Sequence, residues 1–380
     1  MQVTFALMGD FAIPLKALFT NLGHQVIPPP PVTENTIRLG TRHSPELACY
    51  PLKVNIGNYI ESLERGADTI VMAGGVGPCR FGYYAQVQRE ILKDMGYDFN
   101  MIIIDPPQCG LAELRQKLAS LNNGKNWRQI LFALRLFWHK TRALDVLHQK
   151  ALLARPRQKS RGLVTRVYRE YVGLLDEAET PAEVRETYRA GEKALQETAA
   201  QTPPKPTRIA LVGEVYMLLE PYANLDIENA LGDMGVTVER SIYISDWIKD
   251  HVVLSNLRLK RGGSYKKAAA PYLKHFIGGH GWESIGDTVL AARRGFDGVI
   301  HILPFACTPE IVAQSILPRV SKDNRIPVMS LSFDEHSARA GFITRLEAFV
   351  DLLRRRTAPG AKSLKPSLSA EKKEKLSPLA

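Results

Sequence analysis

The sequence contains few cysteines and no cysteine pairs. Its 380 residues hold only Cys49, Cys79, Cys109 and Cys307, and no two of these form a Cys-x-x-Cys motif. This argues against a disulfide framework and against a structural zinc site, since zinc sites usually take their ligands in close pairs. In a reducing compartment, an isolated cysteine is ordinarily a small buried hydrophobic side chain. Each cysteine therefore has to be judged by its own surroundings.

Several other signals are absent as well. No apolar run approaches the roughly 20 residues needed to cross a bilayer, and the N-terminal MQVTFALMGDF has no basic region of a signal peptide. The sequence also lacks GxxxxGK[ST] and GxGxxG, which argues against nucleotide and dinucleotide sites of the usual types. We expect a cytoplasmic globular protein that does not use a membrane.

The composition is that of a globular protein, with an excess of positive charge. Apolar residues make up 45% and charged residues 23%, and the net charge is +11. Much of this charge lies in residues 354–380, which hold eight lysines and arginines against two glutamates. We expect residues 357–380 to form a disordered basic tail; contact of the tail with an acidic partner, a membrane surface or nucleic acid is the alternative. The body of the chain shows no nucleic-acid signature.

Residues 1–110 have the pattern of an N-terminal α/β lobe. Short apolar runs alternate with segments of helical periodicity, which predicts a parallel sheet with helices on both faces. The expected strands are VTFALM (3–8), HQVIPPP, TIVMAG (69–74) and NMIIID (100–105), and the expected helices are IPLKALFTNLG, residues 50–65 and residues 83–96.

Residues 111–202 show helical periodicity only, which predicts a connecting helical subdomain. After the linker TPPKPT, residues 203–356 again alternate between strands and helices, with a mixed polar region at 243–280. We expect strands at 208–214, 237–240, 297–305 and 326–333, and helices at about 221–234, 283–294, 309–320 and 341–356. The predicted fold is α/β, with two Rossmann-like parallel-sheet lobes and a helical connecting subdomain.

Three of the four cysteines follow predicted strands directly. Cys79 follows strand 69–74, Cys109 follows strand 100–105 and Cys307 follows strand 297–305. In open α/β sheets, ligands bind outside the carboxyl ends of the strands. These thiols therefore lie where function concentrates.

The local sequence around three cysteines favours thiolates. Cys49 (CYPLK) and Cys307 (CTPEI) each precede a proline by two residues, which predicts that both thiols lie at helix N-termini. The positive end of a helix stabilises a thiolate there, and Cys79 has Arg80 and flanking glycines beside it. The residues alone leave three readings open: an iron–sulfur cluster with ligands from distant segments, a catalytic thiol, or unrelated buried cysteines.

Other polar residues are candidates for the same cleft. His280, between glycines in GGHGWES, is expected to protonate a reduced substrate or to cap a helix, and Glu310 to transfer protons or to complement a helix N-terminus. Arg80 is expected to pair with the cluster or an anionic substrate, or else with a nearby acid. Glu214 and Asn224 line the cleft or cap helices. A metal site at 334–336 is rejected, because adjacent residues of an extended chain point to opposite faces.

Five stretches resemble a known family. They are CYPLKVNIGNYIESL, GGVGPCRFGYY, VGEVYMLLEPYANLDIENAL, GGHGWESIGDTV and HILPFACTPEIVAQSILP. In their order they resemble the family related to 2-hydroxyglutaryl-CoA dehydratase, in the branch of the dehydratase D-component-like, CoA-protein activase-like and double-cubane cluster proteins. The resemblance covers roughly residues 1–105 and 206–355, and it leaves the helical middle and the basic tail unmatched.

This resemblance implies a cofactor and its ligands. The cofactor would be an iron–sulfur cluster in the cleft between two α/β lobes, either a single [4Fe–4S] cube or an [8Fe–9S] double cubane. Its ligands would be Cys49, Cys79 and Cys307, with Arg80 beside it. Cys109 lies outside the matching motifs, and a buried thiol is its default reading. The resemblance also implies anaerobic electron transfer, a possible homodimer, and a separate ATP-hydrolysing iron–sulfur activator as partner.

The leading functional hypothesis is an iron–sulfur protein that accepts low-potential electrons from that activator and reduces a small-molecule substrate at the cluster. A second hypothesis is a subunit of a 2-hydroxyacyl-CoA dehydratase. A third is a non-catalytic electron relay that carries the cluster for a larger complex. The chain does not resemble the activator itself, since it has neither a P-loop nor a Cys-x-x-Cys motif.

Overall fold

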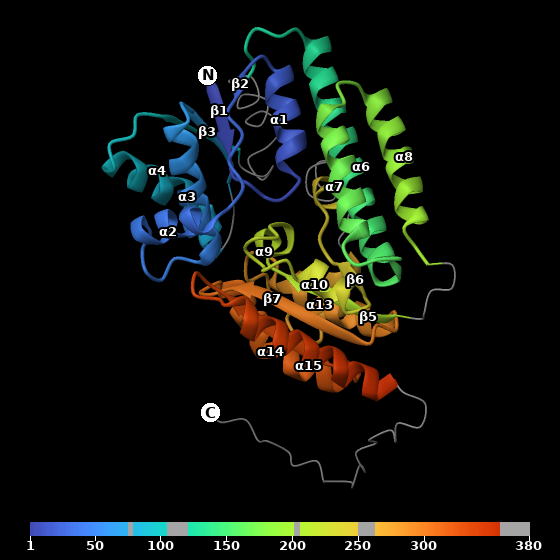
Figure 1. Ribbon diagram of the computed structural model, residues 1–380. Helices are drawn as coiled ribbons and strands as arrows, with labels where there is room; N and C mark the ends of the chain where they lie inside the picture. The colour runs from blue at the N-terminus through green and yellow to red at the C-terminus, as the bar shows by residue number, and fades with distance from the viewer. Residues whose placement is uncertain (75–78, 105–120, 201–205, 250–262, 358–380) are drawn as a thin grey trace, which may run out of the picture.

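Two parallel sheets organise the molecule. A computed structural model describes residues 1–74, 79–104, 121–200, 206–249 and 263–357. The first sheet has the strand order β2-β1-β3-β4 and the second has the order β6-β5-β7-β8, and all pairings in both are parallel. The predicted α/β fold with two Rossmann-like parallel-sheet lobes is confirmed. Figure 1 shows the first lobe above the second, with long helices to one side of both.

The first lobe is a four-stranded sheet between helices. Phe5 and Val71 face the side covered by helix α1 and the start of α6, whereas Ile70 and Met72 face α3 and α4, because successive strand residues point to opposite faces. Its strands are β1 (Gln2–Phe5), β2 (Gln25–Val26), β3 (Thr69–Ala73) and β4 (Asn100–Ile104); its helices are α1 (Ala12–Asn21), α2 (Glu34–His43), α3 (Tyr50–Glu64), the short 3₁₀ helix η1 (Arg80–Tyr83) and α4 (Tyr84–Asp94).

The second lobe repeats this plan with longer strands. Ile300 and Ile302 pack toward α15 and α10, while Val299 packs on the opposite side with residues of α13. Its strands are β5 (Thr207–Gly213), β6 (Val236–Arg240), β7 (Gly298–Pro304) and β8 (Val328–Phe333); its helices are α9 (Val215–Leu219), α10 (Ile227–Asp233), α11 (Ile244–Ile248), α12 (Gly263–Ala269), α13 (Gly281–Arg293), α14 (Thr308–Asn324) and α15 (Arg339–Thr357).

Three helices run alongside both lobes. They are α6 (Trp127–Ala154), α7 (Leu163–Glu177) and α8 (Pro181–Glu197), and a short 3₁₀ helix η3 (Arg155–Arg157) follows α6. Helix α6 packs against α1 of the first lobe and against α11 and β6 of the second, so it braces the two lobes. No helix within the described ranges combines the length and the apolar character that crossing a membrane requires.

The structure differs from the sequence prediction at three points. Helix α2 was not predicted, because its sequence is polar and only one of its faces packs on α3. The helix expected at about 221–234 is shortened to α10, because a turn in which Asp226 has a φ of +58° precedes it, and the short helix α9 before this turn was not predicted. The polar region at 243–280 contains α11 and α12. The predicted basic tail from residue 358 onward lies outside the described residues.

Candidate metal centre

Cys49, Cys79 and Cys307 lie at the contact between the two lobes, each at the start of a helix. Cys49 is the N-cap of α3, Cys79 the N-cap of η1, and Cys307 the N-cap of α14. The backbone N–H groups of Leu52, Phe81 and Glu310, each in the turn that follows one of these cysteines, act to lower the pKa of Cys49, Cys79 and Cys307 respectively. The N-terminal placement predicted from the proline spacing is therefore present. Cys109 lies outside the described residues.

Arg80 ties the three cysteine segments together. Its Nη1 donates to the carbonyl oxygen of Leu47 at 2.8 Å, and its Nη2 donates to the carbonyl oxygen of Ala306 at 3.1 Å. Leu47 immediately precedes the Cys49 turn and Ala306 is the neighbour of Cys307. Arg80 therefore holds the Cys79 turn of the first lobe against both other turns, one of which belongs to the second lobe.

A glycine-rich loop before α13 packs against the turns that carry Cys79 and Cys307. A Cβ atom on Gly279 would lie 3.0 Å from Cγ of Pro309 and 3.8 Å from Sγ of Cys79. A Cβ atom on Gly281 would lie 2.8 Å from the carbonyl oxygen of Pro309. Only bare backbone leaves room here, so the loop around His280 lies directly on the Cys79 thiol and on the first turn after Cys307.

The thiols are not poised as thiolates by the protein alone. Burial raises the pKa of Cys49 to about 12, and the nearby Glu214 adds to this rise. Burial also raises the pKa of Cys79 and that of Cys307. The sequence prediction that helix N-termini and Arg80 would favour thiolates is wrong for the metal-free protein, because desolvation outweighs both effects. A bound cation would reverse this balance, since metal binding deprotonates a coordinating thiol.

Two glutamates stand beside the thiols. Glu214 follows β5, accepts the Met217 N–H at 3.0 Å, and so caps α9. It also lies within electrostatic reach of all three cysteines. Its predicted capping role is confirmed, and its role in lining a cleft stays a prediction. Burial raises the pKa of the Glu214 carboxyl, and the nearby His280 ring partly offsets this rise.

Glu310 lies in the first turn of α14 and is fully buried. Its Oε2 accepts a hydrogen bond from Ser284 Oγ at 2.8 Å and lies 2.8 Å from Nε2 of His301. Its Oε1 has no hydrogen-bond partner among the described residues. Sequence reasoning missed His301, whose one signal is a histidine in the middle of the apolar strand DGVIHILPF.

The remaining candidates are structural. Asn224 donates from Nδ2 to the Met217 carbonyl oxygen at 2.7 Å and accepts the Ile227 N–H at 3.3 Å, which is a capping role. Asp334 accepts from Ser337 Oγ at 2.9 Å. Glu335 pairs with Lys53 across the lobes, with Nζ and Oε1 2.5 Å apart. Because Lys53 is in the first turns of α3, this ion pair holds the Cys49 helix against the second lobe.

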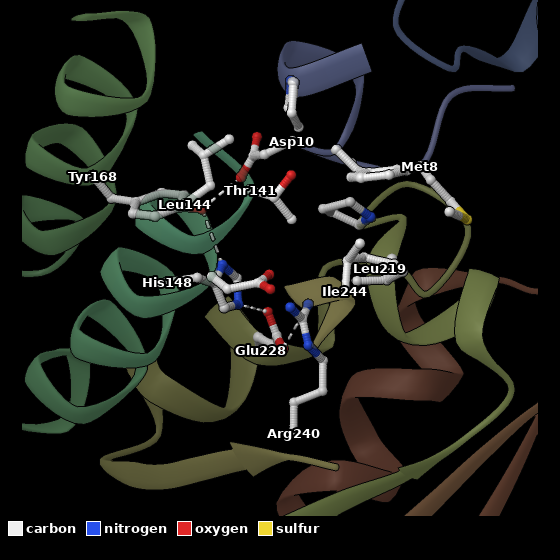
Figure 2. A pocket seen from close by; sticks show the side chains of 15 residues that line it. Met8, Asp10, Thr141, Leu144, His148, Tyr168, Leu219, Glu228, Arg240 and Ile244 are labelled. Atoms are coloured by element: carbon white, nitrogen blue, oxygen red, sulfur yellow. Dashed lines mark hydrogen bonds and ion pairs between the residues drawn. The ribbon is translucent and has the colours of Figure 1, made fainter. Parts of the chain in front are cut away.

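A separate cavity lies where both lobes meet the long helices. Its volume is about 50 Å³, enough for a few water molecules. Figure 2 shows hydrogen bonds that cross it from the first lobe to the second: Tyr168 donates to Asp10 at 2.5 Å and lies 3.1 Å from Nδ1 of His148, whose Nε2 lies 2.7 Å from Glu228. Nη1 of Arg240 lies 3.7 Å from Oε1, the other carboxylate oxygen of Glu228. Sequence reasoning identified none of these residues.

Among the described residues, no three histidine, cysteine or acidic side chains are close enough to hold one metal ion. A cube of four irons spaces its thiolates more widely than a single ion does and takes them from distant segments. The thiols of Cys49 and Cys307 are buried and that of Cys79 is half-buried, and the bare backbone of Gly279 lies against Cys79.

Comparison with known proteins adds no identification. No model of a protein family matches the chain, and no curated protein gives a significant match. The resemblance drawn from the five sequence stretches therefore stays a prediction.

Proposed function

We propose that this protein carries an iron–sulfur cluster on Cys49, Cys79 and Cys307, accepts low-potential electrons from a separate ATP-hydrolysing activator, and reduces a small substrate at the cluster. The observation that carries the proposal is the meeting of three cysteine-capped helix starts, from both lobes, around Arg80. When bound, the cluster would supply one-electron reduction.

The chain's own residues would prepare the site for such a group. Arg80 positions the three cysteine turns and places a positive charge near an anionic cofactor. The backbone N–H groups of the turns that follow the three cysteines lower the thiol pKa values and so favour the charged sulfurs that a metal requires. The low exposure of Cys49 and Cys307, 8% and 7%, keeps water from the sulfurs. The proton-transfer role expected for Glu310 stays a prediction.

The test is anaerobic reconstitution with iron and sulfide, followed by iron and sulfide analysis and by EPR of the reduced protein. We expect at least four irons per chain and a cluster spectrum. The Cys49→Ala, Cys79→Ala, Cys307→Ala triple variant should lose both, whereas Cys109→Ala should keep them and serves as the matched control. An iron-free wild-type protein, or a cluster that persists in the triple variant, would refute the proposal.

The same preparation separates the three functional hypotheses. Turnover of a small substrate with activator and ATP supports the reductase. A spectral change that depends on a 2-hydroxyacyl-CoA thioester supports the dehydratase subunit. Reduction by the activator without turnover of any substrate supports the electron relay. Gel filtration of the loaded protein tests the possible homodimer.

A further inference from the structure

The two lobes share the order of their strands and a helix pair before the third strand. In each sheet the first strand lies between the second and the third, and the fourth follows the third. In each lobe a pair of packed helices precedes the third strand: α2 and α3 before β3, and α12 and α13 before β7. The helix that follows the third strand is α4 in the first lobe and α14 in the second.

The close crossing of each helix pair supports this correspondence. A Cβ atom on Gly57 of α3 would lie 1.9 Å from the carbonyl oxygen of Thr36 on α2. A Cβ atom on Gly286 of α13 would lie 2.3 Å from the carbonyl oxygen of Tyr265 on α12. In both lobes a glycine in the second helix lets the backbone of the first helix approach; it lies eight residues after the N-cap Cys49 in α3 and six residues after the N-cap His280 in α13.

The cysteines follow the same correspondence. Cys79 and Cys307 both cap the element that follows the third strand of their lobe. Cys49 caps α3, and the position that corresponds to it in the second lobe is the N-cap of α13, which is His280. Each lobe thus presents two helix starts, and the four carry three thiols and one imidazole.

The loop that carries His280 packs against the turns of Cys79 and Cys307. The neighbours of His280, Gly279 and Gly281, pack on Cys79 and on the Pro309 that follows Cys307. The residue is partly buried, and its ring acts electrostatically on Glu214, the carboxylate that also acts on all three thiols. Imidazole is an accepted ligand of iron in iron–sulfur clusters, where it replaces a thiolate and raises the reduction potential.

We infer that His280 is a fourth protein ligand of the cluster, so that each lobe contributes two ligands: Cys49 and Cys79 from the first, Cys307 and His280 from the second. This inference rests on the proposed function only because it requires that the protein bind a cluster. It replaces the proton-donor role that the sequence suggested for His280. Because a neutral imidazole carries less negative charge than a thiolate, it is the ligand that a substrate donor atom can displace most readily.

The test is pulsed EPR of the reduced, reconstituted protein, which detects a nitrogen bound to the cluster. We expect a strong nitrogen coupling in the wild type, its complete loss in His280→Ala, and its retention in the control His275→Ala, which removes an exposed histidine of the same segment. His280→Cys should keep the wild-type iron content, lose the nitrogen coupling, and shift the reduction potential to a more negative value.

The outcomes separate this inference from the proposed function. A wild-type cluster that needs the three cysteines but shows no strongly coupled nitrogen overturns the ligand assignment and leaves the proposed function standing. Nitrogen coupling that survives in His280→Ala also overturns the assignment. Failure of any cluster to form in the wild type overturns both.

Discussion

Glu220 offers a direct test of how the lobes are joined. Its side chain is 4% exposed, its Oε2 accepts the Gly9 N–H of the first lobe at 2.9 Å, and its Oε1 accepts the Tyr222 N–H at 3.1 Å. Burial raises the pKa of Glu220 to about 7, with a small further rise from Asp10, although the two N–H donors oppose it. The carboxyl thus joins the turn after β1 to the second lobe at the cost of desolvation.

The sign of the pH effect follows from this raised pKa. The folded protein holds a proton on Glu220 that the unfolded chain releases near pH 4.5. The unfolding free energy therefore falls as the pH rises from about 4.5 to about 7 and stays lower above that range. The difference between the two pKa values corresponds to about 3 kcal/mol, as an upper limit.

Glu220→Gln removes the titration and keeps one oxygen acceptor. The amide leaves one of the two N–H donors facing an NH₂ group, which costs about 1 to 2 kcal/mol at any pH. We therefore expect the variant to be less stable than the wild type at pH 5 and to match or exceed it at pH 8.5. The measurement is urea unfolding of both proteins at pH 5, 6, 7 and 8.5.

The quantity to compare is the change in the stability difference with pH, because all other groups cancel in it. Glu347→Gln, which changes an exposed carboxylate on α15, is the matched control and should show no such change. If the difference between wild type and Glu220→Gln is constant from pH 5 to 8.5, the carboxyl does not titrate in this window and the reasoning fails.

Three further perturbations follow from the structure. Lys53→Met leaves Glu335 buried without its partner and should lower the unfolding free energy by about 3 to 5 kcal/mol, whereas Lys53→Met with Glu335→Leu should recover most of the loss; equal losses in urea unfolding of the two variants would contradict a coupled pair. Gly286→Ala pushes a methyl group against the Tyr265 carbonyl and should cost at least 1 to 3 kcal/mol, while Gly295→Ala meets no atom within 4 Å and tests the cost of its φ of +71° alone; thermal unfolding compares them. Although burial opposes it, His148 and Arg240 lower the pKa of Glu228 to about 2. The contribution of Glu228 to the unfolding free energy is therefore present above pH 4.5 and is lost as the pH falls toward 2. In that range the unfolding free energy of Glu228→Gln should depend less on pH than that of the wild type, and an equal pH dependence would count against the network.

Much of the fold was readable because the strands are short apolar runs bounded by turn residues. Strand β7, buried at every position, and strand β3 were predicted within a residue or two of their observed ends. Helix α2 escaped prediction because Ile37 and Leu39 are its only large apolar residues, and it is fixed by a Thr33 capping box and by packing on α3. Tertiary packing determines whether such a helix forms, and the local sequence pattern does not show tertiary packing.

The sequence predicted where the cysteines of the candidate site lie in the fold, but it did not predict the pKa values of their thiols. Proline two residues after Cys49 and Cys307 placed both at helix starts, because proline is accepted in the first turn of a helix. The raised pKa of each thiol depends on how deeply the other lobe buries it, which no local pattern shows. The Glu310–His301 contact, like the Asp10–Tyr168–His148–Glu228 network, joins residues from different elements and so leaves no spacing to recognise.

The raised thiol pKa values and the interlobe position of the cysteines together couple cofactor binding to lobe contact. In the metal-free protein, contact between the lobes buries neutral thiols beside Glu214. This burial contributes little to the free energy of the interlobe contact. The proposed cluster would take deprotonated thiols from both lobes as ligands, so its binding free energy would also stabilise the interlobe contact. Arg80 and the Lys53–Glu335 pair already hold the lobes together next to these ligands. Removing either fixed contact should therefore weaken cluster retention more than it weakens the folding of either lobe, because the ligand set is complete only when both lobes touch.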